Sequence, residues 1–229
     1  MKNAMPTLQS LNAGYVDTAG FLALQGLFTA HVTGNFVTFG AAAAQGTTGL
    51  IAKLAALPTF CVVVIVARLV SYALPQLGLP VLRSLLVLQV LLLAGSAALA
   101  IRLGPFTDGD SLSALLTGMV LVAAMALQNG MHRVHFAKAP PSTLMTGNST
   151  QIMLDLADLL HGPSADQRAT IHDRLGGFAM AVLAFALGCG AAAAAFVYGG
   201  MWCFLAPPLI VLVLLFAPAD DRAGQKAPA

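Results

Sequence analysis

Long apolar runs alternate with short polar segments along most of this 229-residue chain. A helix needs about 20 mostly apolar residues to cross the hydrocarbon core of a bilayer, and several runs approach or reach that length. The pattern predicts an all-α integral membrane protein with about six transmembrane helices. The expected spans are residues 5–30, 54–77, 81–103, 112–130, 175–197 and 201–216.

The first apolar stretch is too long and too interrupted for one straight helix. Apolar positions continue from Leu11 to Ala44, and Gly14, Asp17 and Gly20 interrupt the run. We therefore expect a full helix followed by a broken or re-entrant piece at about residues 33–44.

A turn-like segment divides the chain into two parts. Residues 104–110 are rich in Gly, Pro and Asp, which punctuate secondary structure. We expect a first membrane repeat at residues 1–104, a second at residues 105–217 and a polar cytoplasmic tail at residues 218–229. Three spans in each part would place the repeats in opposite orientations, as in many transporters. This orientation argument fails if one of the short broken segments crosses the membrane completely.

One tripeptide occurs in both parts. Thr33-Gly34-Asn35 is repeated 113 residues later as Thr146-Gly147-Asn148, and each copy opens a new segment. Gly tolerates backbone conformations that other residues avoid, and Thr and Asn are common helix N-caps. The two tripeptides therefore predict broken or re-entrant half-helices that begin inside the bilayer.

The start of a half-helix has a chemical use. Its first N–H groups are unpaired and carry partial positive charge. In inverted repeats the two helix N-termini would face each other near the bilayer midplane. That arrangement predicts a site for a small polar solute, with an anion or a carboxylate as the best fit. The alternative is that each tripeptide only caps and packs a broken helix.

Two ionisable residues lie inside apolar segments. Asp17 is the only acidic residue before residue 108, and Arg68 lies between Pro58 and Pro75. An Arg inside a span costs about 2.5 kcal/mol or more on insertion scales, so Arg68 should face the bundle interior. We expect an Asp17–Arg68 pair or a shared water-filled cavity, with Arg68 binding solute and Asp17 as counter-ion or proton carrier. A structural pair, or Arg68 snorkelling to an interface, is the alternative.

Further polar groups flank the tripeptides. His31 is a candidate for a proton-coupled step, because histidine is the side chain most often used for proton transfer, although a lone His is more often structural. Asn129 and Gln151 lie beside the second tripeptide, and the offset of 113 places Asp17 opposite Gly130. The candidate solute-binding residues are Asp17, His31, Thr33, Gly34, Asn35, Arg68, Asn129, Thr146, Gly147, Asn148 and Gln151.

Composition excludes several other classes of protein. The chain is 58% hydrophobic and 9% charged with a mean hydropathy of +0.83, whereas soluble domains are about 25% charged. A net charge of +2 without a basic run gives no reason to expect nucleic acid. Walker-type loops, nucleophile–base constellations and metal-ligand spacings are absent, so we expect no enzyme, metal or cofactor. The N-terminal residues lack the apolar region of a signal peptide.

The distribution of Lys and Arg predicts orientation, because cytoplasmic loops are enriched in both. With both termini inside the cell, the opposite side holds only Lys53 and Arg102. The cytoplasmic side then holds Lys2, Arg83, Arg133, Lys138, Arg168, Arg174, Arg222 and Lys226.

Two sequence signatures resemble a known family. The first comprises Gly14-Tyr15-Val16-Asp17 and the segment from Phe28 to Asn35, and the second runs from Thr143 to Asn148 and on to Gln151 and Asp155. In these signatures the chain resembles the YoaK-like small bacterial membrane proteins, whose function is not established, over nearly its whole length. The resemblance implies a bacterial inner-membrane protein of about six helices, labelled at most a transporter. It implies no solute and no site residues.

Three functional hypotheses follow. The first is a transporter or channel for a small polar solute, unidentified, bound between the two tripeptides within the lipid bilayer. The second is a non-transporting assembly or accessory protein, because small residues at Ala184, Gly188 and Ala192 would let helices approach closely in a homo-oligomer. An intramembrane enzyme is the third and has the least support.

Overall fold

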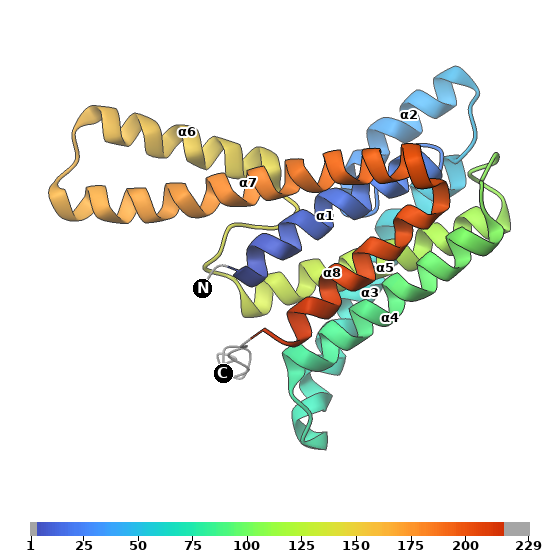
Figure 1. Cartoon of the computed structure of the whole chain (residues 1–229), viewed down its shortest axis with the longest axis horizontal. Coiled ribbons are helices and arrows are strands. Elements are labelled where there is room, and N and C mark those ends of the chain that lie inside the picture. The colour runs from blue at the N-terminus through green and yellow to red at the C-terminus, as the bar shows by residue number, and fades with distance from the viewer. Residues whose placement is uncertain (1–3, 218–229) are drawn as a thin grey trace.

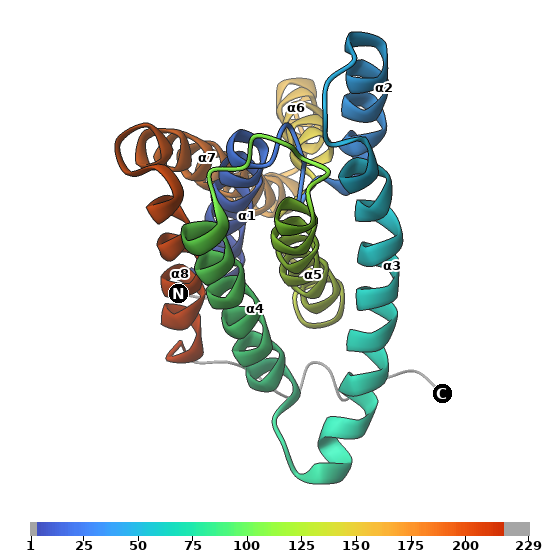
Figure 2. The same ribbon diagram turned by 90° about the vertical axis from the view of Figure 1, so that its right-hand side faces the viewer.

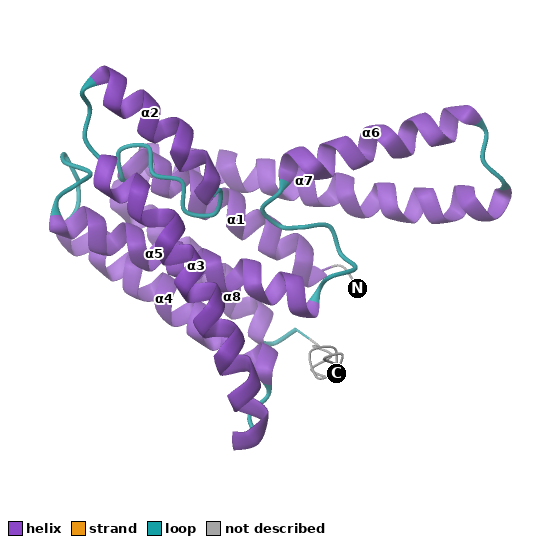
Figure 3. Cartoon of the chain, turned by 180° about the vertical axis from the view of Figure 1, so that it is seen from behind, coloured by secondary structure: helices purple, strands orange, loops and turns teal. Residues whose placement is uncertain are grey.

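The computed structural model describes residues 4–217, and this part of the chain is helical with no strands. Figure 1 shows the arrangement of the helices, and Figure 3 shows the longer loops that join α1 to α2 and α5 to α6. The expected tail at residues 218–229 lies outside the described residues. The α-helices are α1 (Ala4–Ala23), α2 (Asn35–Gln45), α3 (Leu50–Ala73), α4 (Val81–Leu103), α5 (Leu112–His135), α6 (Met145–His161), α7 (Ala165–Gly199) and α8 (Ala206–Leu215), and the 3-10 helices are η1 (Val32–Gly34), η2 (Leu74–Leu77) and η3 (Gly200–Leu205).

Four helical stretches of the described chain are long and apolar enough to cross a membrane. They indicate a membrane protein, as the sequence predicts. The longest stretch includes both α7 and α8, and the chain turns between them at Gly200, whose φ is 53°. The stretches are Leu50–Leu77, Val81–Leu103, Leu112–His135 and Ala165–Leu215.

The long helices run in two opposing sets. In Figure 1, α1, α4 and α7 run toward the end of the molecule where α3 begins, whereas α3, α5 and α8 run back from it. The short helix α2 lies at that end. Figure 2 shows α5 between α3 and α4, and α8 on the other side of α4. Among neighbours, α1 and α7 run in the same direction, as do α3 and α5, whereas α4 runs antiparallel to both α5 and α8.

Helices α1 and α7 approach each other closely at two glycines. A Cβ atom added at Gly14 would clash with the carbonyl group of Phe185, and one added at Gly188 would clash with the carbonyl oxygen of Leu11. Ala184 and Ala192, which flank Gly188 on the same face of α7, are also buried. The small-residue stripe therefore serves packing within the chain, as small residues do where helices meet in membranes.

The end of the molecule at which α3 begins is closed by polar contacts between loops. The carboxylate of Asp110 accepts hydrogen bonds from the backbone N–H groups of residues 49–52 at 2.8–3.2 Å. These N–H groups have no partners within α3, so the carboxylate stabilises the helix start. Lys53 Nζ donates to the carbonyl oxygens of Gln25 and Thr48, at 2.8 and 3.3 Å. The contacts join the loops before α3 and before α5.

Candidate functional site

A cavity of about 410 Å³ lies between α3 and α5. The loops before α2 and α6 also line it, through residues 30–33 and 143–144. Its walls are mainly apolar, with Phe60 and Val64 among them. Several polar or basic side chains line the same space, and none of the lining residues is acidic. They are His31, Thr33, Arg68, Ser71, Asn129, Arg133, His135 and Thr143.

Arg68 lines this cavity from the second half of α3. Its guanidinium carbon lies 4.4 Å from the ring centroid of Tyr72, a cation–π contact one turn further along the helix. The only ion pair among residues 4–217 joins Arg174 to Asp155. The predicted Asp17–Arg68 pair is therefore wrong, because the carboxylate of Asp17 is engaged elsewhere.

Asp17 binds the backbone of the loop that follows α1. Its Oδ1 atom accepts hydrogen bonds from the backbone N–H groups of Thr29, Ala30 and His31, at 2.7, 2.8 and 3.4 Å. The residue is only 5% exposed. A carboxylate that accepts several N–H bonds satisfies backbone donors that have no helical partner. Asp17 thus shapes the loop that presents His31 and Thr33 to the cavity.

The two Asn residues of the tripeptides close the loops that precede them. Phe28 N donates to Asn35 Oδ1 at 2.9 Å, and Asn35 Nδ2 donates to the Phe28 carbonyl oxygen at 2.7 Å. In the second copy, Asn148 Nδ2 donates to the Pro141 carbonyl oxygen at 2.8 Å. Both contacts span seven residues, and proline has no N–H group for a reciprocal bond. Both Asn side chains are about 1% exposed, so neither faces the cavity.

The helix-capping role predicted for the tripeptides is wrong. Neither α2 nor α6 has a side-chain hydrogen bond at its N-cap, and α6 begins at Met145, before the tripeptide. Gly34 has an ordinary helical backbone, with φ of −62° and ψ of −22°. A Cβ atom there would lie 3.0 Å from the Phe28 ring, so Gly34 provides space and not an unusual conformation. Gly147 lies within α6 with nothing within 4 Å of such a Cβ atom.

Asn129 connects the cavity to the second loop. Thr143 Oγ1 donates to Asn129 Oδ1 at 2.7 Å, and Asn129 Nδ2 donates to the Met125 carbonyl oxygen at 3.1 Å. Both Asn129 and Thr143 line the cavity. The offset of 113 residues relates Ala30 to Thr143, and it relates Asp17 to Gly130, the neighbour of Asn129. The Asn129–Thr143 contact of the second half therefore corresponds closely to the Asp17–Ala30 contact of the first. The second half uses a neutral amide where the first uses a carboxylate.

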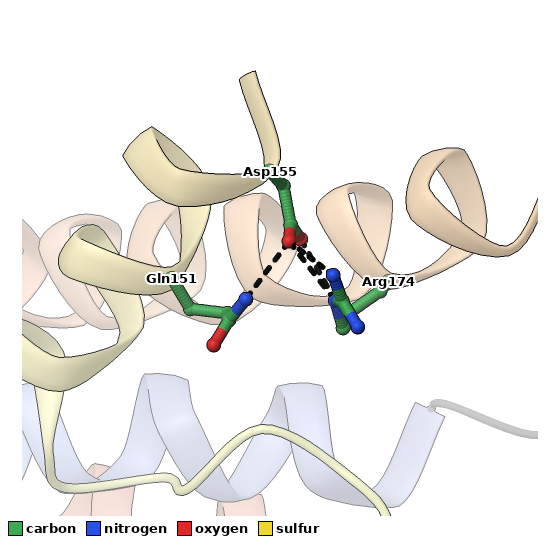
Figure 4. Close-up of polar contacts among 3 residues, drawn as sticks. All are labelled: Gln151, Asp155 and Arg174. Atoms are coloured by element: carbon green, nitrogen blue, oxygen red, sulfur yellow. Dashed lines mark hydrogen bonds and ion pairs between the residues drawn. The ribbon is translucent and has the colours of Figure 1, made fainter. Parts of the chain in front are cut away.

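Gln151 belongs to a different cluster, shown in Figure 4. Its Nε2 atom donates to Asp155 Oδ1 at 2.8 Å, and Arg174 Nε donates to both Asp155 oxygens at 3.0 Å. The hydrogen bonds from Arg174 hold the pKa of Asp155 below its usual range. The cluster joins α6 to α7, whose first turns run beside α6 away from the other helices (Figure 1). The sequence singles out Gln151 but does not indicate its partners, because Arg174 lies on another helix.

A buried amide network was not predicted from the sequence. Gln128 Oε1 accepts from Asn12 Nδ2 and from Gln89 Nε2, both at 2.9 Å, and Gln128 Nε2 donates to the carbonyl oxygen of Gln9 at 2.8 Å. These bonds join α1, α4 and α5 at positions that are at most 3% exposed. Gln89 stands alone in a Leu-rich run, and that isolation was the signal that an interior polar partner exists.

The cavity thus brings together His31, Thr33, Arg68 and Asn129 from among the predicted binding residues. Asp17, Asn35 and Asn148 instead hold loop backbones, as described above. Gly34, Thr146, Gly147 and Gln151 do not line the cavity. Arg133 and His135 also line the cavity, although they were not among the binding residues predicted from the sequence. Their position at the end of α5, just before the second loop, could have indicated that they face the same space. No cluster of three metal-ligating side chains occurs in residues 4–217.

Comparison with known proteins gives one result. The chain belongs to a family described as "Protein of unknown function (DUF1275)", whose model matches residues 5–217. No curated protein matches the chain, and no solved structure does. The narrower resemblance to YoaK-like proteins therefore stays a prediction.

Proposed function

We propose that this member of the family carries a small organic anion across a bacterial inner membrane, binding it in the cavity between α3 and α5. The observation that carries the proposal is the charge of that cavity. Arg68 and Arg133 line it, together with two His side chains, and no acidic residue does. An arginine at membrane depth without an acidic partner is costly, and a bound anion would supply the missing charge.

The shape and composition of the cavity favour an anion with an apolar body. A volume of about 410 Å³ lies within the range of about 300–1,000 Å³ that is usual for small-molecule sites. Apolar residues such as Leu57, Phe60 and Val64 form much of the wall. The cavity also lies beside the start of α6, whose first backbone N–H groups favour negative charge. An aryl or alkyl carboxylate or sulfonate satisfies these requirements.

The repeat proposed for the chain supports transport. Helices α5 to α8 follow α1 to α4 in the same order of long, short, long and final helix, and the closing Asn residues are 113 residues apart. In Figure 1 each long helix of the first set runs opposite to its counterpart in the second. Helix α1 packs chiefly on α7, and α5 packs on α3. In the proposed repeat α5 corresponds to α1 and α3 corresponds to α7, so the two pairs are equivalent. These relations support the proposal of inverted repeats, in which solute sites lie between the two halves.

We further propose six crossings and cytoplasmic termini. The four apolar stretches give five crossings when the stretch that turns at Gly200 is counted as two, and α1, which packs among them, is the sixth. Arg83, Arg133 and Arg174 then lie toward the end of the molecule opposite to Lys53 and Arg102. This distribution agrees with an excess of basic residues on the cytoplasmic side. The cavity, bounded by the later parts of α3 and α5, lies nearer that side than the midplane.

A binding titration tests the site. Purified protein in detergent is titrated calorimetrically with benzenesulfonate, which stays ionised at any working pH, and with benzylammonium as a cation of similar size. We expect the sulfonate to bind and Arg68→Gln to weaken it at least tenfold, about 1.4 kcal/mol. Arg102→Gln, an exposed arginine at the end of α4, is the matched control and should bind as the wild type does. Equal affinity for both ions, or no effect of Arg68→Gln, would contradict the proposal.

A non-transporting accessory protein is the second candidate, and one surface favours it. Met153, Leu156 and Leu160 of α6 are 59%, 40% and 89% exposed and lie on one face of the helix. Together they form an apolar surface at the projecting α6–α7 pair, which a partner protein would cover. The stripe at Gly188 no longer supports this candidate, because α1 already covers it.

A further inference from the structure

A second cavity, of about 280 Å³, lies between α1 and α7. It holds three titratable groups, the carboxylate of Asp17, the imidazole of His31 and the thiol of Cys189. No basic side chain of an Arg or Lys lines it. His31 also lines the cavity between α3 and α5, and it is the one residue that the two lining sets share.

The two oxygens of Asp17 have different surroundings. All three backbone hydrogen bonds described above end on Oδ1. This leaves Oδ2 as the oxygen available to the second cavity, which Asp17 lines. A carboxylate among apolar helices with no ion-pair partner in the described chain is an acceptor for a proton. Because Oδ1 already holds the loop, Oδ2 can gain or lose a proton while the loop stays closed.

The charged groups of the two cavities lie toward opposite ends of the bundle. Asp17 is in the last third of α1, whose end lies near the start of α3 (Figure 1). Arg68 and Arg133 are near the other ends of α3 and α5. His31 lies between these groups, with its backbone N–H on Asp17 and its ring at the edge of both cavities. His31 is therefore the single residue through which the two cavities are connected.

We propose that Asp17 and His31 bind the proton that accompanies the anion, so that the protein is a proton–anion symporter. This inference rests on the proposed function. One proton binds at Asp17 Oδ2, passes to the His31 ring and leaves on the side to which the anion is released. A proton and a monoanion together carry no net charge, which removes the main electrostatic cost of moving the anion through the membrane. Cys189 lines the same cavity from α7 and takes no part in the proton transfer.

The test uses the whole protein in proteoliposomes. Uptake of radiolabelled benzenesulfonate is measured with the outside more acidic than the inside and again without a pH gradient, and a trapped pH-sensitive dye reports proton entry. A sulfonate is chosen because it does not cross lipid as a neutral acid. We expect the gradient to raise the initial uptake rate at least threefold, with one proton entering for each anion.

The decisive variant is Asp17→Asn, which keeps an oxygen for the backbone N–H groups but cannot carry the proton. We expect it to bind benzenesulfonate as the wild type does and to take it up without any response to the gradient. His31→Gln tests the same route through the other residue and should also lose the gradient response. Gradient-driven uptake that persists in both variants overturns the proton pathway alone, as does wild-type uptake indifferent to the gradient. Binding without uptake under any gradient overturns transport itself.

Discussion

Asn35 and Phe28 exchange two hydrogen bonds, so that one buried amide side chain satisfies both backbone groups of a loop residue seven positions earlier. The same relationship holds between Asn148 and Pro141, with a single bond. In both halves the asparagine fixes the loop that lines the cavity between α3 and α5. The asparagine of each tripeptide thus holds a non-helical loop among apolar helices, where unpaired backbone groups are costly.

Replacing the two asparagines should therefore have unequal effects. Asn35→Ala leaves a partly buried N–H and a partly buried C=O of Phe28 without partners, at up to about 1–3 kcal/mol each. Asn148→Ala leaves only one carbonyl group of Pro141 unpaired. We expect a larger fall in the apparent melting temperature in detergent for Asn35→Ala than for Asn148→Ala. An equal or reversed order would show that the hydrogen bonds do not hold the loops.

The contact between α1 and α7 should depend on the absence of one side chain. Gly188→Ala places a methyl group against the carbonyl oxygen of Leu11, which must shift the helices apart. Gly190→Ala, two residues away on α7, meets nothing within 4 Å and is the control. We expect a clear loss of thermal stability for Gly188→Ala and little change for Gly190→Ala. Wild-type stability in both variants would contradict the close approach.

Filling the cavity should block binding without changing its charge. Ala67 lines the cavity from α3 and is 7% exposed, whereas its neighbour Val66 is 50% exposed on the outer face of that helix. Ala67→Phe adds a ring to the space a ligand would occupy, and Val66→Phe adds the same ring outside it. We expect Ala67→Phe to abolish benzenesulfonate binding in the calorimetric titration. Retained affinity in Ala67→Phe, or its loss in Val66→Phe, would place the ligand elsewhere.

The link between α6 and α7 should weaken in acid. The hydrogen bonds from Arg174 lower the pKa of Asp155 below its usual value of 3.8, so the folded state favours the ionised carboxylate. Its contribution to stability is complete above that usual value and is lost as the pH falls through the lower, folded-state value. We expect hydrogen exchange in α6 to speed up, relative to the intrinsic rate, below about pH 4. Asp155→Asn should remove this acid dependence, and a wild-type α6 with unchanged protection at lower pH would contradict it.

The helices were largely predictable because their apolar runs are long and their boundaries are chemically marked. The expected span at residues 81–103 matches α4, and Gly162 ends α6 in the left-handed conformation that glycine favours. Helix α7 begins ten residues before the expected span at residue 175, because its first turns are polar and lie beside α6. Hydropathy alone detects the apolar part of a helix and misses such an extension.

The site was only partly predictable, because side-chain partners depend on packing between distant segments. Arg68 and His31 attract attention as ionisable residues near apolar runs, and both line the cavity. The partner of Asp17 was assigned by charge, but local backbone N–H groups compete with a distant arginine and bind the carboxylate at shorter range. The glycines were assigned by conformational freedom, whereas Gly34 is needed for the space that the Phe28 ring occupies.

The proposed binding of an organic anion beside Arg68 and Arg133 can be tested by locating a heavy-atom anion in the protein. Crystals of the protein grown with 4-iodobenzenesulfonate would reveal the iodine by its anomalous scattering. We predict one strong iodine peak among the apolar residues of the cavity near Phe60 and Val64, with the sulfonate within hydrogen-bonding distance of Arg68. A cavity without the anion at saturating concentration, or iodine only at the outer surface of the helices, would show that the cavity is not an anion-binding site.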